Sequence, residues 1–414
     1  MTSTPTVTVT ATDSRAFWRF WSASTVSRTG SGITAVALPL VALTSLHATT
    51  LQVTLLAAAS QAAWLLLGLP AGVIAQRVPL RALQVSMDMV RMVAMGSVPV
   101  AWWLDRLTFV HLLLTALITG LATVIFDIAN STFLPALVSK EELTARNSLI
   151  SGTDAVTQTG APSVSGLLIK AVGAVDVLVI DSISYLISAV TLWTLPERRP
   201  KPLPQVPVLA LIREGCAFVM RHPVMRPCVI WATVSNFFTA ALMALTPLYL
   251  VREVGASPTV VGLVIAADGV GSLLGSMVAT RLSVRIGTAR AMIASGVLGG
   301  ALALVIPVTT SLGDIGYFVI GNAAVSMAVV IGSILARTHR QVESPPELLS
   351  RVMATVRFIS WGALPVGALL SGLLADSIGL RPALWMVCAG FLLAPLVLIS
   401  STVRKLRDLS GARV

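Results

Sequence analysis

The stretch Gly271-Ser-Leu-Leu-Gly275 decides the fold, because it and the basic turn that follows it, Ala279-Thr-Arg281-Leu-Ser-Val-Arg285, occur twice in the chain. The first copy reads Gly68-Leu-Pro-Ala-Gly72 and then Ala75-Gln-Arg77-Val-Pro-Leu-Arg81, a little over two hundred residues earlier. Two small residues four positions apart let a second helix approach closely, and such pairs are typical of helices packed in membranes. Repetition at a constant distance indicates a duplicated unit.

A third correspondence falls at the same distance. Ser139-Lys-Glu-Glu142 is followed by Arg146, and Ser344-Pro-Pro-Glu347 is followed by Arg351. Both have the spacing of a capping box, in which a Ser side chain bonds to the backbone of the first helical turn and a Glu three residues later returns a bond. Three matches at one distance predict two copies of a six-helix unit.

Composition places these helices in a membrane. Of the 414 residues, 55% are hydrophobic and only 11% are charged, and the mean hydropathy is +0.87. A soluble domain carries about 25% charged residues, and a spanning helix needs roughly 20 mostly apolar residues. The sequence therefore predicts an all-α polytopic membrane protein whose twelve transmembrane helices form two six-helix bundles, over residues 19–45, 51–75, 80–104, 109–136, 146–170, 174–195, 227–251, 258–280, 288–309, 314–338, 350–374 and 382–403.

A linker is expected between the two bundles. Residues 1–195 are predicted to form the N-terminal bundle, and residues 227–414 the C-terminal bundle with a short cytoplasmic tail. Residues 196–226 are rich in proline and basic side chains and are interpreted as a cytoplasmic linker. The amphipathic stretch from Val208 to Met220 predicts a surface helix within this linker.

The distribution of Arg and Lys sets the expected orientation, because positive residues accumulate in cytoplasmic loops. If both termini are cytoplasmic, the 29 Lys and Arg residues lie inside except for five: Arg28 within a span, and Arg106, Lys170, Arg252 and Arg381 in outer loops. The net charge of +11 then reports topology rather than nucleic-acid binding. We expect a monomer that crosses the cytoplasmic (inner) membrane of a bacterium many times and contacts its lipid bilayer.

Short motifs recur in a fixed order along most of the chain. They are Phe126-Asp127-Ile-Ala129, Leu134-Pro135, Ala145-Arg146-Asn147, Asp181-Ser-Ile-Ser184-Tyr185, Leu248-Tyr249-Leu250, Arg340-Gln341, Leu348-Leu-Ser-Arg351-Val352, Arg357-Phe-Ile359 and Trp361-Gly362. In order and spacing these motifs resemble the major facilitator superfamily, and more narrowly its branch of multidrug, macrolide and enterobactin-type exporters.

The resemblance implies a secondary active transporter in which two bundles rock about a site at the membrane midplane. It further implies that the first, fourth, seventh and tenth helices line a central cavity. Two departures stand out: Gln76 replaces the acidic residue that the family usually has in a cytoplasmic charge latch, and Ala161-Pro-Ser-Val-Ser-Gly166 replaces a glycine-richer exporter motif. The first departure predicts a weaker latch, and the second weakens the antiporter interpretation.

Four of the charged residues within the expected spans are the main candidates for function, because a charge at mid-membrane costs about 2.5–3.5 kcal/mol to insert. Asp127 is interpreted as a proton-titrating group or a counter-ion for a cationic compound, or else as a structural ion pair. Asp154 belongs to a polar patch or is a structural partner, and Asp268 contacts substrate or bonds within the bundle. Arg28 is expected to pair with Asp154 or Asp127.

Further polar residues complete the candidate set. Asn130, Asn236 and Asn322 lie on expected cavity helices and either contact substrate or join helices by hydrogen bonds. A cytoplasmic cluster is expected to act as a structural charge latch, and its members are Arg77, Arg81, Asp88, Arg91, Arg281 and Arg285.

Motifs of other function classes do not occur in the sequence. It has no phosphate-binding loop of the Walker type, no metal-ligand spacing among its four His and three Cys, and no nucleophile elbow in a strand-turn-helix context. We therefore expect neither an enzyme nor a cofactor or metal site. The resemblance favours export of an amphipathic small compound, such as a drug, antibiotic or siderophore-like molecule, by proton antiport. An importer of the same fold and a non-transporting receptor or lipid-handling protein remain alternatives. Few fixed charges in the cavity would favour a hydrophobic or weakly cationic substrate.

Overall fold

The computed structural model describes residues 14–48, 52, 55–56, 59, 63–64, 66–197 and 207–410. Every regular element in these ranges is a helix. The first group comprises α1 (Ser14–Ser45), α3 (Pro70–Arg77), α4 (Leu80–Trp103), α5 (Phe109–Phe133), α6 (Leu143–Val172) and α7 (Ala174–Trp193). After α8 (Val208–Arg221), the second group comprises α9 (Met225–Arg252), α10 (Pro258–Ile286), α11 (Thr288–Ala303), α12 (Ile315–Glu343), α13 (Leu349–Ile378), α14 (Leu380–Gly390) and α15 (Leu393–Ile399).

The prediction of an all-α polytopic membrane protein is confirmed. Within the described ranges, nine helical stretches have the length and hydropathy to cross a membrane. Two more expected spans, α4 and α6, are helices of 24 and 30 residues but are more polar, because α4 carries Arg81, Asp88 and Arg91 and α6 carries Asp154. The remaining expected span, 51–75, is described only in part, at residues 52, 55–56, 59, 63–64 and 66–75. The last span, predicted as one helix, is divided into α14 and α15.

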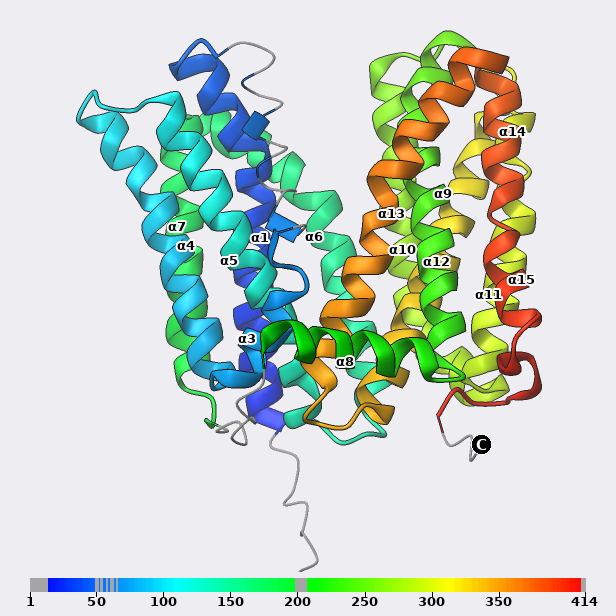
Figure 1. Cartoon of the computed structure of the whole chain (residues 1–414). Helices are drawn as coiled ribbons and strands as arrows, with labels where there is room; N and C mark the ends of the chain where they lie inside the picture. The colour runs from blue at the N-terminus through cyan, green and yellow to red at the C-terminus, as the bar shows by residue number, and fades with distance from the viewer. Residues whose placement is uncertain are drawn as a thin grey trace, which may run out of the picture.

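The helices form two side-by-side groups (Figure 1), α1 to α7 in one and α9 to α15 in the other. Each group has its own buried apolar clusters. Tyr185 packs with Leu178 and Val98 in the first, and Phe318 packs with Tyr249 in the second. Many large apolar side chains at the outer surface are exposed, as lipid-facing residues are.

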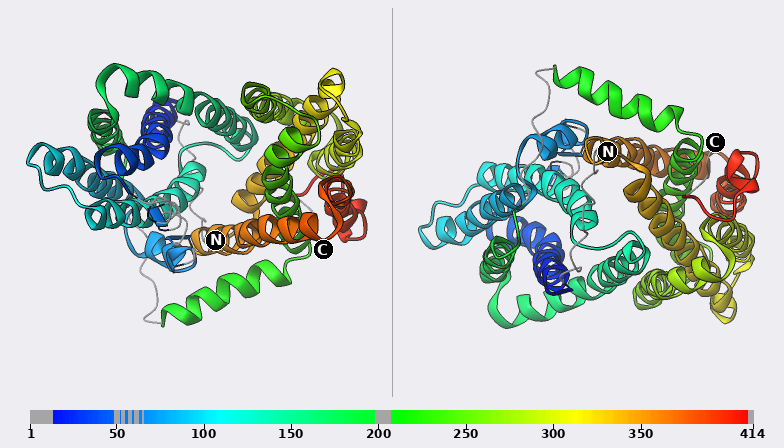
Figure 2. Two further views of the ribbon diagram at one scale, coloured as in Figure 1. Left: turned by 90° about the horizontal axis from the view of Figure 1, so that it is seen from above. Right: turned by 90° about the horizontal axis from the view of Figure 1, so that it is seen from below.

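Four pairs of helices join the groups, and they form two matched sets. α3 packs on α13, and α10 packs on α6. In each of these two contacts, which we call seams, the second helical region of one group meets the fifth helix of the other. α5 also packs on α13, and α12 packs on α6, which are fourth-to-fifth contacts in both directions. Views along the helices show the same arrangement (Figure 2). This correspondence is what a duplicated unit predicts.

A repeated glycine turn provides a further sign of duplication. Gly173 joins α6 to α7 with φ of 94°, and Gly379 joins α13 to α14 with φ of 93°. Glycine adopts this left-handed conformation without the steric cost that a Cβ would impose. Both glycines follow the fifth helix of their group, so the same tight connection occurs at equivalent points.

The linker helix α8 lies across one end of the molecule (Figure 1). It packs on α3 from the first group and on α9 and α13 from the second. Glu214 of α8 forms an ion pair with Arg351 of α13 at 2.5 Å. The structure therefore contains the surface helix expected over 208–220, and α8 defines the end of the molecule that we call the α8 side.

The expected capping boxes are wrong in detail. α6 begins at Leu143 without a side-chain cap, and α13 likewise begins at Leu349 without one. The Ser344 hydroxyl is buried and has no hydrogen-bond partner among the described residues. The Ser-x-x-Glu spacing thus marks two equivalent loops, but it does not produce the reciprocal bonds.

Candidate functional site

A cavity of about 280 Å³ lies between the two groups of helices. It is bounded by α1, α5 and α6 on one side and by α9, α12 and α13 on the other. The first, fourth, seventh and tenth helices in chain order, which the family resemblance placed around a cavity, are α1, α5, α9 and α12. All four contribute to the wall, together with the fifth helix of each group.

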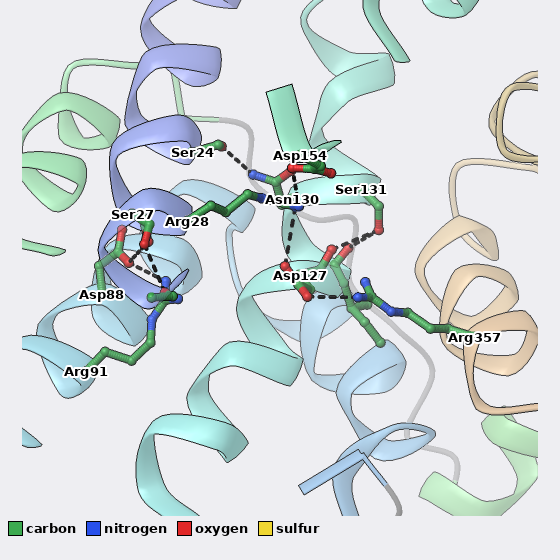
Figure 3. A network of polar contacts seen from close by, with 12 residues as sticks. Ser24, Ser27, Arg28, Asp88, Arg91, Asp127, Asn130, Ser131, Asp154 and Arg357 are labelled. Atoms are coloured by element: carbon green, nitrogen blue, oxygen red, sulfur yellow. Dashed lines mark hydrogen bonds and ion pairs between the residues drawn. The ribbon is translucent and has the colours of Figure 1, made fainter. Parts of the chain in front are cut away.

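A chain of ion pairs crosses this cavity (Figure 3). Arg28 of α1 donates to Asp154 of α6 at 2.8 Å and to Asp127 of α5 at 3.4 Å. Arg357 of α13 donates to the other carboxylate oxygen of Asp127 at 2.9 Å. The Asp127 carboxylate therefore bridges an arginine of its own helix group and an arginine of the opposite group.

Aromatic rings hold Arg357 in place. Its guanidinium carbon lies 4.1 Å from the ring centre of Trp64 and 4.2 Å from that of Trp361. A guanidinium over an indole face gains cation–π attraction, which is stronger where water is excluded. Trp64 and Trp361 themselves pack at 4.9 Å between ring centres. Arg357 is thus oriented toward Asp127 by rings from both helix groups.

The three asparagines of the candidate set occupy different environments. Asn130 and Asn236 line the cavity, but each donates to a neighbouring helix: Asn130 to Ser24 Oγ at 2.7 Å and Asn236 to Ser360 O at 2.9 Å. Asn322 is buried away from the cavity wall, and it donates to a backbone carbonyl of α10 at 3.4 Å.

Asp268 does not join the other candidates. It is half-buried on α10 and does not belong to the cavity wall. Within the described part of the chain no hydrogen bond or ion pair reaches its carboxylate. Asp268 therefore lies outside the cavity that holds Asp127, and no described residue makes the bond within the bundle that was one of its two expected roles.

Sequence reasoning missed three arginines of the cavity. Arg337, Arg340 and Arg357 were assigned to the cytoplasmic rim because they lie near the ends of spans, yet all three line the cavity. The expectation of few fixed charges in the cavity is also wrong, since its wall holds four arginines and two aspartates. The sequence does contain one sign of this site, because Arg337 and Arg340 are three residues apart and therefore share one face of α12.

Neutral hydrogen bonds close the cavity on the α8 side. Asn147 of α6 donates to Thr338 at 3.1 Å and to the side-chain oxygen of Gln341 at 2.5 Å, both on α12. Gln341 in turn donates to Ser131 O at 2.9 Å. Ser148 of α6 shares a 3.0 Å hydrogen bond with Thr280 of α10.

Neutral hydrogen bonds also close the seam between α3 and α13 on the α8 side. Ser350 of α13 donates to Gly72 O of α3 at 2.7 Å, and the Gln76 amide donates to Glu347 O. A Cβ on Gly72 would lie 2.7 Å from the Ala354 Cβ, so this seam needs glycine for its close approach. Gln76 therefore retains a contact between the groups without the charge that an aspartate would bring.

The expected charge latch is only partly assembled. Asp88 and Arg91 pair within the first group, where Ser188 donates to Asp88 at 2.6 Å. Arg81 pairs with Glu197 at 3.1 Å. Arg77 is exposed at the end of α3. Two further members, Arg281 and Arg285, are exposed and form no ion pair within the described ranges. These arginines face water at the α8 side, so no low-dielectric surroundings strengthen a pairing.

The chain matches known transporters along nearly its whole length. A family model described as "Transmembrane secretion effector" matches residues 7–412. The multidrug efflux pump Tap of Mycolicibacterium fortuitum is 26% identical over 403 residues, which cover 92% of this chain and 94% of that protein. Macrolide efflux protein A of Streptococcus pyogenes is 22% identical, with 82% and 84% covered.

Solved structures show the same fold. A bacterial homologue of the iron transporter ferroportin, in its outward-facing state, superposes with a TM-score of 0.74 at 19% identity, covering 93% of this chain and 99% of that one. At this identity the similarity concerns the fold alone. Together with the family match, it shows that the chain is a transporter of the major facilitator superfamily, rather than an enzyme, and that it belongs to the transmembrane secretion effector family.

Proposed function

We propose that this protein exports an amphipathic small organic compound from the bacterial cytoplasm in exchange for protons, and that Asp127 carries the proton. One observation supports this proposal above all: the Asp127 carboxylate bridges Arg28 in its own half and Arg357 in the other. The two relatives named as efflux proteins for drugs and macrolides support the export direction and the substrate type.

Protonation of Asp127 would weaken the bridge between the halves. A neutral carboxyl group loses the Coulomb attraction to Arg357, while Arg28 keeps its partner Asp154 at 2.8 Å. The hydrogen bonds that Asn147, Gln341, Ser350 and Gln76 make across the α8 side are neutral, and each contributes about 1 kcal/mol. A proton that reaches Asp127 from the side opposite α8 would therefore favour opening of the α8 side. Antiport requires this order of events.

We propose that the α8 side is cytoplasmic and that the bundles 1–195 and 227–414 rock as bodies about the cavity, with residues 196–226 as their linker. The excess of Arg and Lys at this side supports this orientation. Both termini are then cytoplasmic, in the inner membrane of a bacterium. We further propose that one chain suffices for transport, because the cavity is bounded by helices of a single chain.

Transport in everted membrane vesicles tests this proposal. We expect vesicles with the wild-type protein to accumulate at least one compound from a panel of amphipathic anionic, neutral and cationic dyes and drugs when respiration acidifies their interior. The Asp127→Asn variant should lose this accumulation while its abundance in the membrane stays unchanged. Asp376→Asn is the matched control, since Asp376 is an exposed carboxylate on α13 outside the cavity.

Three results would contradict the proposal. Normal proton-driven accumulation by Asp127→Asn would exclude Asp127 as the proton carrier. Accumulation only in right-side-out vesicles would indicate an importer, and a total lack of transport over a broad panel of compounds would favour a receptor or a lipid-handling protein.

A further inference from the structure

The cavity wall carries more positive than negative side chains. Its ionisable wall residues are four arginines, Arg28, Arg337, Arg340 and Arg357, and two aspartates, Asp127 and Asp154. Among the described residues of the cavity wall there is no lysine, glutamate or histidine. A cavity within a membrane protein that holds more cations than anions attracts negative charge, because surroundings of low dielectric constant strengthen every Coulomb interaction.

The two aspartates are already engaged by two of the arginines. Asp154 accepts from Arg28, and Asp127 accepts from both Arg28 and Arg357. Arg357 is further enclosed by two tryptophan rings. These contacts account for both carboxylates, so the excess positive charge belongs to the remaining pair.

Arg337 and Arg340 form that pair. Neither has a carboxylate within ion-pair distance in the part of the chain that the structure describes. Arg340 Nε is buried and has no hydrogen-bond partner there. The spacing of three residues places both guanidinium groups on the same face of α12, the face that borders the cavity. A guanidinium presents donors in a planar fork that matches carboxylate and phosphate oxygens.

Apolar side chains border the same cavity. Trp231 of α9 and Trp361, Met353 and Val356 of α13 contribute to its wall. Aromatic and thioether side chains accept flat apolar groups of varied shape. The cavity thus combines a basic surface on α12 with an apolar surface on α9 and α13.

We propose that the transported compounds are amphipathic organic anions, whose carboxylate or similar acidic group binds Arg337 and Arg340 and whose apolar part packs against Trp231 and Trp361. This inference rests on the proposed transport function and replaces the weakly cationic substrate that the sequence suggested. Arg28 and Arg357 then keep their partners and remain available for coupling, while Arg337 and Arg340 select the charge of the substrate.

Equilibrium binding to the purified full-length protein tests the inference. Dansylglycine and dansylcadaverine carry the same fluorophore with an anionic and a cationic group, respectively, on linkers of different length, and the arginine variants separate the effect of charge from that of the linker. We expect dansylglycine to bind at least about tenfold more tightly. Arg337→Gln and Arg340→Gln should each weaken dansylglycine binding by about tenfold to a hundredfold, the usual loss for a charged hydrogen bond. Arg290→Gln is the matched control, because Arg290 is exposed on α11 away from the cavity.

The experiment has clear opposing outcomes. Equal or tighter binding of dansylcadaverine, unchanged dansylglycine binding in both arginine variants, or binding of neither probe would overturn the inference. If a glutamine variant does not fold, Arg337→Lys and the salt dependence of wild-type binding provide the same discrimination. Because binding is measured without a membrane gradient, it is independent of the vesicle test of proton exchange, so either proposal can fail alone.

Discussion

Removal of the Asp127 carboxylate should open the α8 side of the transporter. The Asp127 and Arg357 side chains retain 14% and 25% of their exposure, so their ion pair lies between a surface pair and a buried one. Loss of one partner from a fully buried pair costs about 3–5 kcal/mol, and an exposed pair contributes about 0.2–1 kcal/mol. For this partly exposed pair we expect about 2 kcal/mol, which is about a thirtyfold change in the ratio of closed to open molecules.

Distance measurement between two spin labels would detect this change. Lys140 and Pro346 are exposed residues in loops on the α8 side, one in each half. Labels on cysteines at these positions, in a protein whose native Cys216, Cys228 and Cys388 have been replaced, report how far the halves separate. We expect a single short distance at neutral pH in the otherwise wild-type protein and a substantial long-distance population in Asp127→Asn.

Acid should have the same effect as the mutation, but only where Asp127 is present. We expect lower pH to increase the long-distance population in the Asp127 protein and to leave the Asp127→Asn distribution unchanged. Asp376→Asn should behave as the wild type does. Identical distributions for Asp127→Asn and wild type at every pH would refute the idea that this ion pair holds the α8 side closed.

Three other predictions follow from single contacts. Gly72→Leu should prevent closure of the α3–α13 seam and raise the long-distance population in the same assay, because even a Cβ would lie 2.7 Å from that of Ala354. Asp88→Ala should lower stability by about 3–5 kcal/mol, measured by thermal unfolding in detergent, because Arg91 is left buried without its carboxylate partner. Partial burial lowers the pKa of His222 below 6.5, and its Nδ1 accepts two backbone N–H bonds at the start of α9. The contribution of neutral His222 to the free energy of unfolding is therefore present above pH 6.5 and is lost as pH falls through the lowered pKa. The melting temperature should consequently fall more steeply with acid in the wild type than in His222→Asn.

Long helices and their duplication could be predicted from the sequence because both depend on local patterns. An apolar run satisfies its own backbone hydrogen bonds as a helix in lipid, whichever neighbours it finds. Small residues such as Gly72 and Gly275 mark close helix contacts, and in the structure both face another helix: Gly72 faces Ala354 and Gly275 faces Met327. These features need no knowledge of how the two halves meet.

The cavity could not be predicted in the same way, because it depends on which residues of separate helices face one another. A count of Arg and Lys cannot distinguish a residue on the cytoplasmic rim from one that points inward near the end of a helix. Arg337 and Arg340 are of the second kind, since α12 continues to Glu343 and the cavity reaches its last turns. The pairing of Arg28 with both Asp127 and Asp154 likewise depends on how α1, α5 and α6 face one another across the cavity.

A transporter must break its closing contacts in every cycle, and the composition of these contacts fits that requirement. The bonds that Asn147, Gln341, Ser350 and Gln76 make across the α8 side are neutral, so each is weak and none responds to pH within the physiological range. Stronger, charged closure at Gln76 would make the closed state harder to leave. Because these neutral bonds give only modest stability, the loss of about 2 kcal/mol that we expect when Asp127 is neutralised would be enough to change which side is open. With Gln76 in place of the acidic residue that the family usually has, control of closure would be concentrated in the cavity itself, where we propose that a proton binds Asp127 and an anionic substrate binds the neighbouring Arg337 and Arg340.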